Sequence, residues 1–192
     1  MFSQKKVEKQ LLVGTHISTI AIELNKVSSI TLKSTSENFI SIKAISEGEY
    51  ADSFVISDYE HGNTINIVGE VSFMFFNIQD KLSAHKVHAI TLEITVPERL
   101  LVHLNSDIGN LKASGFYTNL TASLITGNCL LMDVSGEVII SSLSGNIFLE
   151  AKSGMVLPET RSGSIIEERL PLGKSVFKLK TVKGDINIVQ TN

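Results

Sequence analysis

Amide and acidic side chains recur after glycine in the second half of the sequence, and regularly spaced oxygen ligands are what a calcium site requires. The residues that follow these glycines are Asn110, Asn128, Glu137, Asn146, Met155, Ser164 and Asp185. Calcium-binding nonapeptide repeats need an aspartate in nearly every turn, because Ca²⁺ takes six to eight oxygen ligands. Carboxylates are too few here, so we expect these residues to form turns rather than to bind calcium.

The histidines and the clustered acids lack the partners that chemistry would need. His85 and His88, in the segment HKVH, face opposite sides of a strand, and no third ligand follows them as in a HExxH helix. His103 lies in the alternating segment LLVHLNS, which predicts an outward side chain. The acids of EGEY (47–50) and IEER (166–169) have no converging partner for acid–base work. We predict a non-enzymatic protein with no catalytic residue, metal ligand or cofactor.

Cys129 is the single cysteine, so neither an intramolecular disulfide framework nor a multi-cysteine metal site can form. It stands two residues after Gly127, in a slot that Val and Ile occupy in other copies of the same pattern. The pattern places no basic group beside it to lower the pKa of its thiol. We therefore predict a small buried side chain rather than a nucleophile.

Composition and charge exclude some partners. The chain has 192 residues, with 17 Lys and Arg against 20 Asp and Glu, and no basic run, so we expect no nucleic-acid binding. No stretch approaches the ~20 apolar residues of a membrane-spanning helix. The start, MFSQKKVEKQLLVGTH, shows no apolar run of signal-peptide length. The expected location is the cytoplasm, or elsewhere if a leader has been removed.

Alternating apolar residues predict strands through most of the chain. The clearest segments are ISTIAIEL (17–24), SSITLKS (28–34), FISIKAIS (39–46), TINIVGE (64–70) and HAITLEITV (88–96). The best helix candidate, NIQDKLSAHKV (77–87), has few large apolar residues and predicts a loop with one turn of helix. The fold class is therefore all-β.

Glycine recurs at multiples of nine residues in the second half, and glycine suits a sharp corner because it tolerates positive φ and close backbone approach. These turn glycines are Gly109, Gly127, Gly136, Gly145, Gly154 and Gly163, with Gly184 displaced by an insertion around EERLPLGKS (167–175). Two residues after them stand Leu111, Cys129, Val138, Ile147, Val156, Ile165 and Ile186, which we predict to form an inward ladder. Four residues after the glycines the apolar series continues, until Glu167 breaks it.

Each nine-residue unit is predicted to be one short strand plus a corner, and stacked units bury a shared interior. Two units form an 18-residue coil with two opposed sheets, which predicts a β-solenoid (β-helix); a 27-residue triangular coil is the alternative. We expect a single domain, 1–192, with irregular β coils or a cap in 1–104 and the regular solenoid in 105–192. Handedness and oligomeric state stay open.

The segment VSFMFF (71–76) is apolar without alternation. This predicts a core strand or a cap over an open end of the stack, the alternative being an apolar contact surface for a partner or lipid. Solenoids need capped ends, because an open terminal coil recruits other chains. The N-terminal strands and the EERLPLGKSVF insertion are the expected caps.

The repeats also resemble a known family. Their sequences are SGEV (135–138), SGNI (144–147), SGMV (153–156), SGSI (162–165) and KGDI (183–186). Over about the last hundred residues the chain is similar to the bacterial putative-adhesin families, which include the putative auto-transporter adhesin head ("GIN") domain and related SG-(D/N)-(V/I) repeat proteins of unknown function. The resemblance implies a β-helix with tight turns, adhesion, a location at the cell envelope or outside the cell, and no established catalytic residues.

The predicted function is a non-enzymatic, adhesin-like binding module whose ligand, a protein or a carbohydrate, is unknown. It would act through the flat faces of its sheets, with an outward surface that includes Glu137, Ser141, Asn146, Phe148 and Glu150. One alternative is a cytoplasmic structural scaffold or regulatory protein. Another is a carbohydrate-active β-helix enzyme, which would need Asp, Arg or His clustered on one face.

Overall fold

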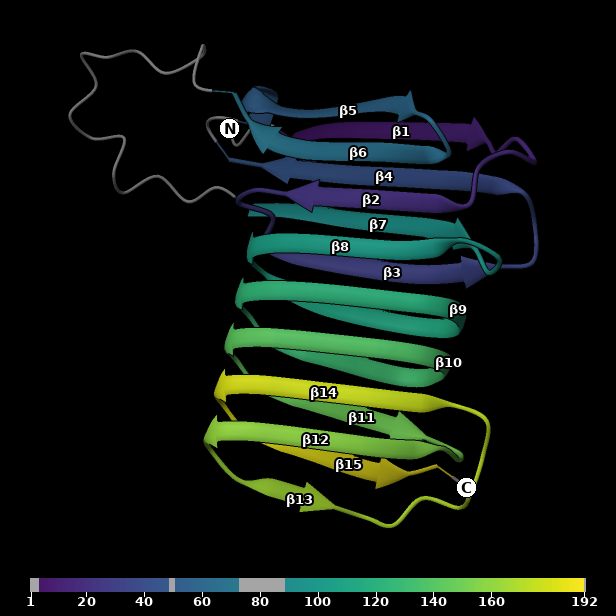
Figure 1. Cartoon of the computed structure of the whole chain (residues 1–192). Helices are drawn as coiled ribbons and strands as arrows, with labels where there is room; N and C mark the ends of the chain where they lie inside the picture. Colours follow the sequence, from purple (N-terminus) through teal and green to yellow (C-terminus); the bar gives the residue numbers. More distant parts are fainter. Residues whose placement is uncertain (1–3, 49–50, 73–88, 192) are drawn as a thin grey trace, which may run out of the picture.

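The computed structural model describes residues 4–48, 51–72 and 89–191, and these residues form an all-β fold (Figure 1). All fifteen strands belong to one hydrogen-bonded sheet. The only helical element in the described part is a 3-10 turn, η1 (Ala51–Ser53). The all-β fold class is therefore confirmed, whereas the helical turn predicted in 77–87 lies outside the described residues.

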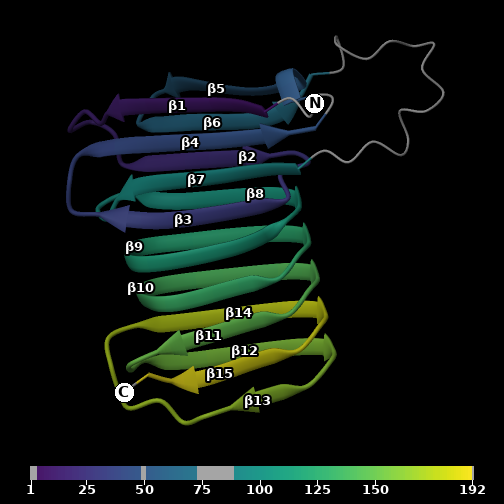
Figure 2. The same ribbon diagram turned by 180° about the vertical axis from the view of Figure 1, so that it is seen from behind.

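The sheet curls back on itself into two rows of strands that face each other across the interior. The back row of Figure 1 contains, in order, β1 (Gln4–Leu12), β4 (Phe39–Glu47), β7 (Ala89–Pro97), β3 (Ser29–Thr35), β9 (Asn110–Thr126), β10 (Cys129–Ser144), β11 (Ile147–Ala151), β15 (Ile186–Gln190) and β13 (Ile165–Glu167). The front row contains β5 (Phe54–His61), β6 (Thr64–Val71), β2 (Thr19–Leu24), β8 (Leu101–Ile108), the second halves of β9 and β10, β14 (Val176–Lys183) and β12 (Met155–Ser162). Figure 2 shows the same rows from behind.

The long strands β9 and β10 belong to both rows because each bends at a glycine with positive φ, Gly115 in β9 and Gly136 in β10. The first half of β10 pairs with β11 and its second half with β14. Each of these two strands therefore has its first half in the back row and its second half in the front row.

Strands in the middle of the stack are parallel, with neighbours 18 residues apart in sequence. Cys129 pairs with Leu111 on one side and with Ile147 on the other. This spacing is that of two nine-residue units per layer, and the 27-residue spacing of a triangular coil does not occur among these pairs. The N-terminal end differs, because β1–β4, β4–β7 and β5–β6 pair antiparallel.

Apolar side chains from both rows form one hydrophobic core. Five residues of the ladder are at most 1% exposed: Leu111, Cys129, Val138, Ile147 and Ile186. Val156 is only half-buried, and Ile165, for which the spacing predicts an inward position, is 42% exposed. Both belong to the last layer, in which β12 and β13 each have a paired strand on one side only.

The last layers are not stacked in chain order. In the front row β14 lies between β10 and β12, and in the back row β15 lies between β11 and β13 (Figure 1). Phe177 therefore occupies the layer next to Val138, where continuation of the 18-residue spacing would place Val156. The C-terminal strands are inserted between two layers formed by earlier parts of the chain.

Both ends of the stack carry covering segments. At the last layer, Leu170 of the 168–175 segment is buried, and the Pro171 carbonyl accepts a hydrogen bond from the Gly154 amide (3.0 Å). At the first layers, β1 and β5 form the outer strands. Val71 is buried at the end of β6, but most of the segment Val71–Phe76 lies outside the described residues, so its role as a cap stays a prediction.

One corner between the rows is a column of glycines, one per layer: Gly109, Gly127, Gly145, Gly184 and Gly163. A Cβ on Gly127 would overlap the carbonyl oxygen of Gly109, and a Cβ on Gly145 would overlap that of Gly127. The amide of Gly127 also donates to the carbonyl of Ser144 in the adjacent layer (2.9 Å). The layers touch through their backbones, so no side chain fits at this corner.

We predict that Gly127→Ala lowers the free energy of unfolding by about 3 kcal/mol or more, because overlap with a carbonyl adds to the strain of positive φ. The matched control is Gly62→Ala, since a Cβ there meets nothing within 4 Å. Its expected cost is only about 1 kcal/mol, from the left-handed backbone. Urea unfolding measures both, and equal losses would contradict the backbone-contact explanation.

Candidate functional site

The five outward positions singled out in the sequence do not form one surface. Glu137 and Ser141 lie in the second half of β10, in the front row, whereas Phe148 and Glu150 lie on β11 in the back row. The chain turns a corner between them, so successive nine-residue units face opposite sides of the molecule. Asn146 stands at that corner.

Asn146 belongs to a ladder of side chains that join successive layers. The side-chain oxygen of Asn110 accepts from the Asn128 amide (3.0 Å), and that of Asn128 accepts from the Asn146 amide (2.8 Å). The series continues from Asn146 to the amide of Asp185 (2.8 Å), and from Asp185 to the amide of Ser164 (2.7 Å). These oxygens accept hydrogen bonds from backbone amides of the adjacent layer, which explains why Asn and Asp follow several of the glycines.

The front row carries a hollow of about 270 Å³. It lies where β2, β8 and β9 run side by side, and Glu23, Asn105 and Ser123 are in register across these strands. It is lined by both polar and apolar residues, namely Glu23, Leu24, Asn25, Asn105, Ser106, Asp107, Ser123, Leu124 and Ile125. The hollow therefore presents carboxylate, amide and hydroxyl groups on a rigid sheet.

Hydrogen bonds hold the polar side chains of this hollow in place. The amide of Asn105 donates to a carboxylate oxygen of Glu23 (2.7 Å). A carboxylate oxygen of Asp107 accepts from the backbone amides of Lys26 (2.8 Å) and Ile108 (2.7 Å). The hollow therefore contains fixed side-chain groups of both hydrogen-bonding kinds, donors on Asn105 and acceptors on Glu23 and Asp107.

Apolar side chains border the hollow on the same face. Ile125 is 55% exposed, and Leu143, which the β9–β10 register places beside it, is 52% exposed. Ile108, at the end of β8, is also exposed. The front row thus combines a polar hollow with an apolar border.

A second hollow, of about 500 Å³, lies at the opposite edge of the rows. Its lining comes from the bend of β10, from the connection between β11 and β12, and from the residue before β14: Asp133, Val134, Ser135, Lys152, Ser153 and Ser175. Unlike the first hollow, it has half of its lining residues in connections between strands, namely Lys152, Ser153 and Ser175.

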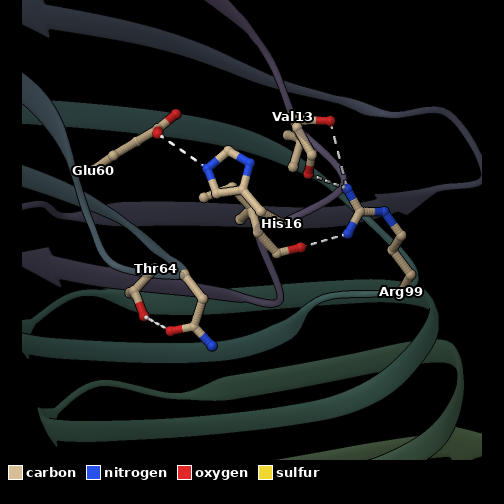
Figure 3. Close-up of polar contacts among 8 residues, drawn as sticks. Val13, His16, Glu60, Thr64 and Arg99 are labelled. Atoms are coloured by element: carbon tan, nitrogen blue, oxygen red, sulfur yellow. Dashed lines mark hydrogen bonds and ion pairs between the residues drawn. The ribbon is translucent and has the colours of Figure 1, made fainter.

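Arg99 is the centre of a polar cluster near the N-terminal layers (Figure 3). Its guanidinium donates to the carbonyls of Ile17 (2.6 Å) and Gly14 (3.0 Å) and to the side-chain oxygen of Asn38 (2.9 Å). Because these donors bind the main chain and a turn, Arg99 acts as a clamp between segments far apart in sequence.

His16 lies beside this clamp and approaches Glu60 at 3.6 Å (Figure 3). Both side chains are more than half exposed. The contact is therefore solvent-exposed and holds the His16 ring beside Glu60 of β5.

The remaining candidates for chemistry are placed as follows. His103 is exposed on β8, between the buried Val102 and Leu104, and Cys129 is buried. His85 and His88 lie outside the described residues. Within 4–48, 51–72 and 89–191, no three His, Cys, Asp or Glu side chains gather in a way that could hold a metal ion. In the same part, no helix has the length and apolarity needed to cross a membrane.

Sequence reasoning did not find the hollow or the Arg99 clamp. Glu23 and Asn105 are 82 residues apart, and Arg99 donates to residues 61 to 86 positions away. The N-terminal strands carry no repeat that would set their register against β8. In the sequence, only the alternation of apolar and polar residues in β2 and β8 indicates which of their side chains point outward and could line the hollow.

The fold has a counterpart among solved structures. A putative cell adhesion protein from Clostridium sporogenes superposes with a TM-score of 0.62 at 16% identity, covering 97% of this chain and 100% of that chain. A putative adhesin from Parabacteroides merdae gives a TM-score of 0.42 at 12% identity, covering 96% and 81%. No protein-family profile and no curated protein matches the sequence. The first likeness concerns the fold alone, and the second adds no weight to it.

We predict that Asn146→Ala lowers the free energy of unfolding by about 1 kcal/mol, because the Asp185 amide loses its acceptor. Asn146→Asp keeps an oxygen at that position and is the matched control, with an expected loss well below that of alanine. Urea unfolding at neutral pH measures both. Equal losses would show that the ladder oxygen does not stabilise the corner.

Stability should also fall at alkaline pH because of Cys129. Burial raises the pKa of its thiol from near 9 to about 12, so above about pH 9 the unfolded chain loses this proton while the folded chain keeps it. Cys129→Val should reduce the loss of unfolding free energy between about pH 9 and pH 11 by about 1.4 kcal/mol per pH unit. Parallel pH profiles of the two proteins would contradict this.

Proposed function

We propose that the chain is a β-solenoid binding module of the adhesin type that binds a carbohydrate in the front-row hollow. The observation that carries the proposal is the hollow itself, in which carboxylate, amide and hydroxyl groups from three neighbouring strands converge on a space of about 270 Å³. A sugar is rich in hydroxyls that donate and accept hydrogen bonds, and these groups supply both kinds of partner.

The apolar border supports the same ligand class. Ile125 and Leu143 lie on the same face as Ser123 and Asn105, and a sugar ring presents C–H groups as well as hydroxyls. A binding site that pairs a few placed polar groups with apolar contacts is typical of small-molecule recognition.

Two further observations support the hypothesis that the chain is an adhesin-like module. The turn motifs SGEV, SGNI, SGMV, SGSI and KGDI resemble those of the bacterial putative-adhesin families. The Clostridium sporogenes protein that shares the fold carries the name of a putative cell adhesion protein. We therefore place the chain at the cell envelope or outside the cell, as a single unit in which 1–104 supplies the irregular cap and 105–192 the regular solenoid.

The 18-residue parallel register supports the solenoid architecture. Parallel layers that are repeated at a constant spacing give a rigid, extended face, and solenoids use such faces for binding. A rigid face loses little conformational entropy when a ligand binds. The polar residues on the front row are thus held in place before the ligand arrives.

The test is a glycan array followed by calorimetry with the glycans that bind. Ser123→Trp fills the hollow and is expected to weaken binding about tenfold or more, since the ligand loses at least one hydrogen-bonded position. Ser57→Trp is the matched control, because Ser57 is exposed on β5 in the same row but does not line the hollow. Binding that both substitutions weaken equally, or an array without a binding glycan, would contradict the proposal.

A further inference from the structure

The last layers of this fold depart from the stacking order that the repeat spacing predicts. The 18-residue spacing that joins β9, β10 and β11 would place Val156 beside Val138 and Ile165 beside Ile147. In the structure Phe177 and Ile186 take those places, and residues 155–167 are moved one layer outward. The repeat sequence and the observed order therefore disagree at one defined position in the stack.

Glu167 makes the repeat order unfavourable. Continued 18-residue spacing would set Glu167 beside Leu149, which is fully buried, with Ile188 on its other side. An unpaired carboxylate in that apolar interior costs several kcal/mol, by an order-of-magnitude estimate. In the observed outer layer Glu167 is exposed, because nothing in the described structure covers that side of β13 with a further strand.

Pro158 favours the same outer layer. The amide of Met155 donates to the carbonyl of Ser175, which shows that alternate residues of β12 from Met155 onward direct their backbone toward β14. Pro158 falls in the other set, which faces the unpaired edge, where its missing N–H costs no hydrogen bond. In an inner layer the same residue would have to donate to a strand and could not.

The C-terminal strands suit the inner layer for the opposite reason. Phe177, Leu179, Ile186 and Ile188 all point inward and are at most 1% exposed. The corresponding residues of the outer layer, Val156, Pro158, Ile165 and Glu167, are smaller, partly exposed or charged. The larger apolar set therefore occupies the position with strands on both sides.

We infer that Glu167 and Pro158 select between two stacking orders of one chain, and that removing them allows residues 155–167 to pair directly with β10 and β11. In the second order β14 and β15 form the outermost layer, and the chain follows its sequence without insertion. The glycine corner is compatible with both orders, because Gly163 and Gly184 each stack on a preceding glycine in the column. The selection is a conformational property of the solenoid and does not depend on the proposed ligand.

Engineered cysteine pairs report which order is present. Ile139 is in register with Lys178, and Lys178 with Leu157, so Ile139 and Leu157 lie two strand spacings apart, or ~9.6 Å. The second order would bring Ile139 and Leu157 to one spacing, ~4.8 Å, which is within the Cα separation of a disulfide. The native Cys129 needs no replacement, because it is buried and its pKa is about 12.

The experiment uses the full chain under mild oxidation, with non-reducing gels and peptide mass spectrometry. With Glu167 and Pro158 present, Ile139→Cys/Lys178→Cys is expected to form an intramolecular disulfide and Ile139→Cys/Leu157→Cys to stay reduced. In a Glu167→Leu/Pro158→Val background the second pair should become oxidised. Its yield should exceed that of the off-register pair Ile139→Cys/Glu159→Cys about tenfold, since the loop lengths are nearly equal.

Matched substitutions separate selection from general destabilisation. Glu159→Leu removes an exposed carboxylate from β12, the strand that contains Pro158. It should leave the Ile139→Cys/Leu157→Cys pair reduced. Glu167→Leu and Pro158→Val are also scored singly, with circular dichroism to verify folding, and each should raise the yield of the 139–157 disulfide. An unchanged 139–178 disulfide in the Glu167→Leu/Pro158→Val background, or a 139–157 disulfide that joins two chains, would overturn the inference.

Discussion

Direct backbone contact between successive layers is the constraint on which this structure depends. At the glycine corner the carbonyl of one layer occupies the space in which the next layer would have its Cβ. This contact sets the layers at the spacing of strands in a sheet, so residues beyond the corner are in register with residues of the adjacent layers. The Asn110–Asn128–Asn146 ladder then joins the same layers through side-chain oxygens. Register, burial and the outward faces all follow from this corner.

The sequence predicts much of this part because the constraint is local. Where no Cβ fits, only glycine is possible, so glycine marks each layer, and residues two positions on must point inward because strands alternate. Burial of each inward Val, Ile or Leu contributes roughly 1.5–3 kcal/mol, which explains why Leu111, Val138 and Ile147 are apolar. The bend at Gly115, where β9 passes from one row to the other, is not predicted by the spacing, because Gly115 is not part of the nine-residue series.

The order of the last layers could not be predicted from spacing, because spacing describes neighbours that follow one another in the chain. The inserted C-terminal strands follow the same local pattern as the repeats, because Gly184 lies in the glycine corner and Ile186 in the inward ladder. Which segment forms the outermost layer depends instead on which one tolerates a strand edge without a paired neighbour. Glu167 was visible in the sequence as a break in the apolar series, and its meaning is physical: a carboxylate in that slot belongs to a layer with solvent on one side.

The candidate binding site depends on register between segments that share no repeat. Asn105 and Ser123 are neighbours at the regular 18-residue spacing, whereas Glu23 joins them because β2 inserts beside β8, where neither the turn glycines nor the Asn ladder extends. The regular layers and the N-terminal strands thus contribute different features to the hollow. The regular layers provide rigidity, since their corner contacts allow few alternatives, whereas the N-terminal strands, with antiparallel pairs and the Arg99 clamp, place carboxylates beside that rigid face. A hollow lined by polar groups therefore forms where the repeat begins, because non-repeating side chains of β2 adjoin the regular strands there.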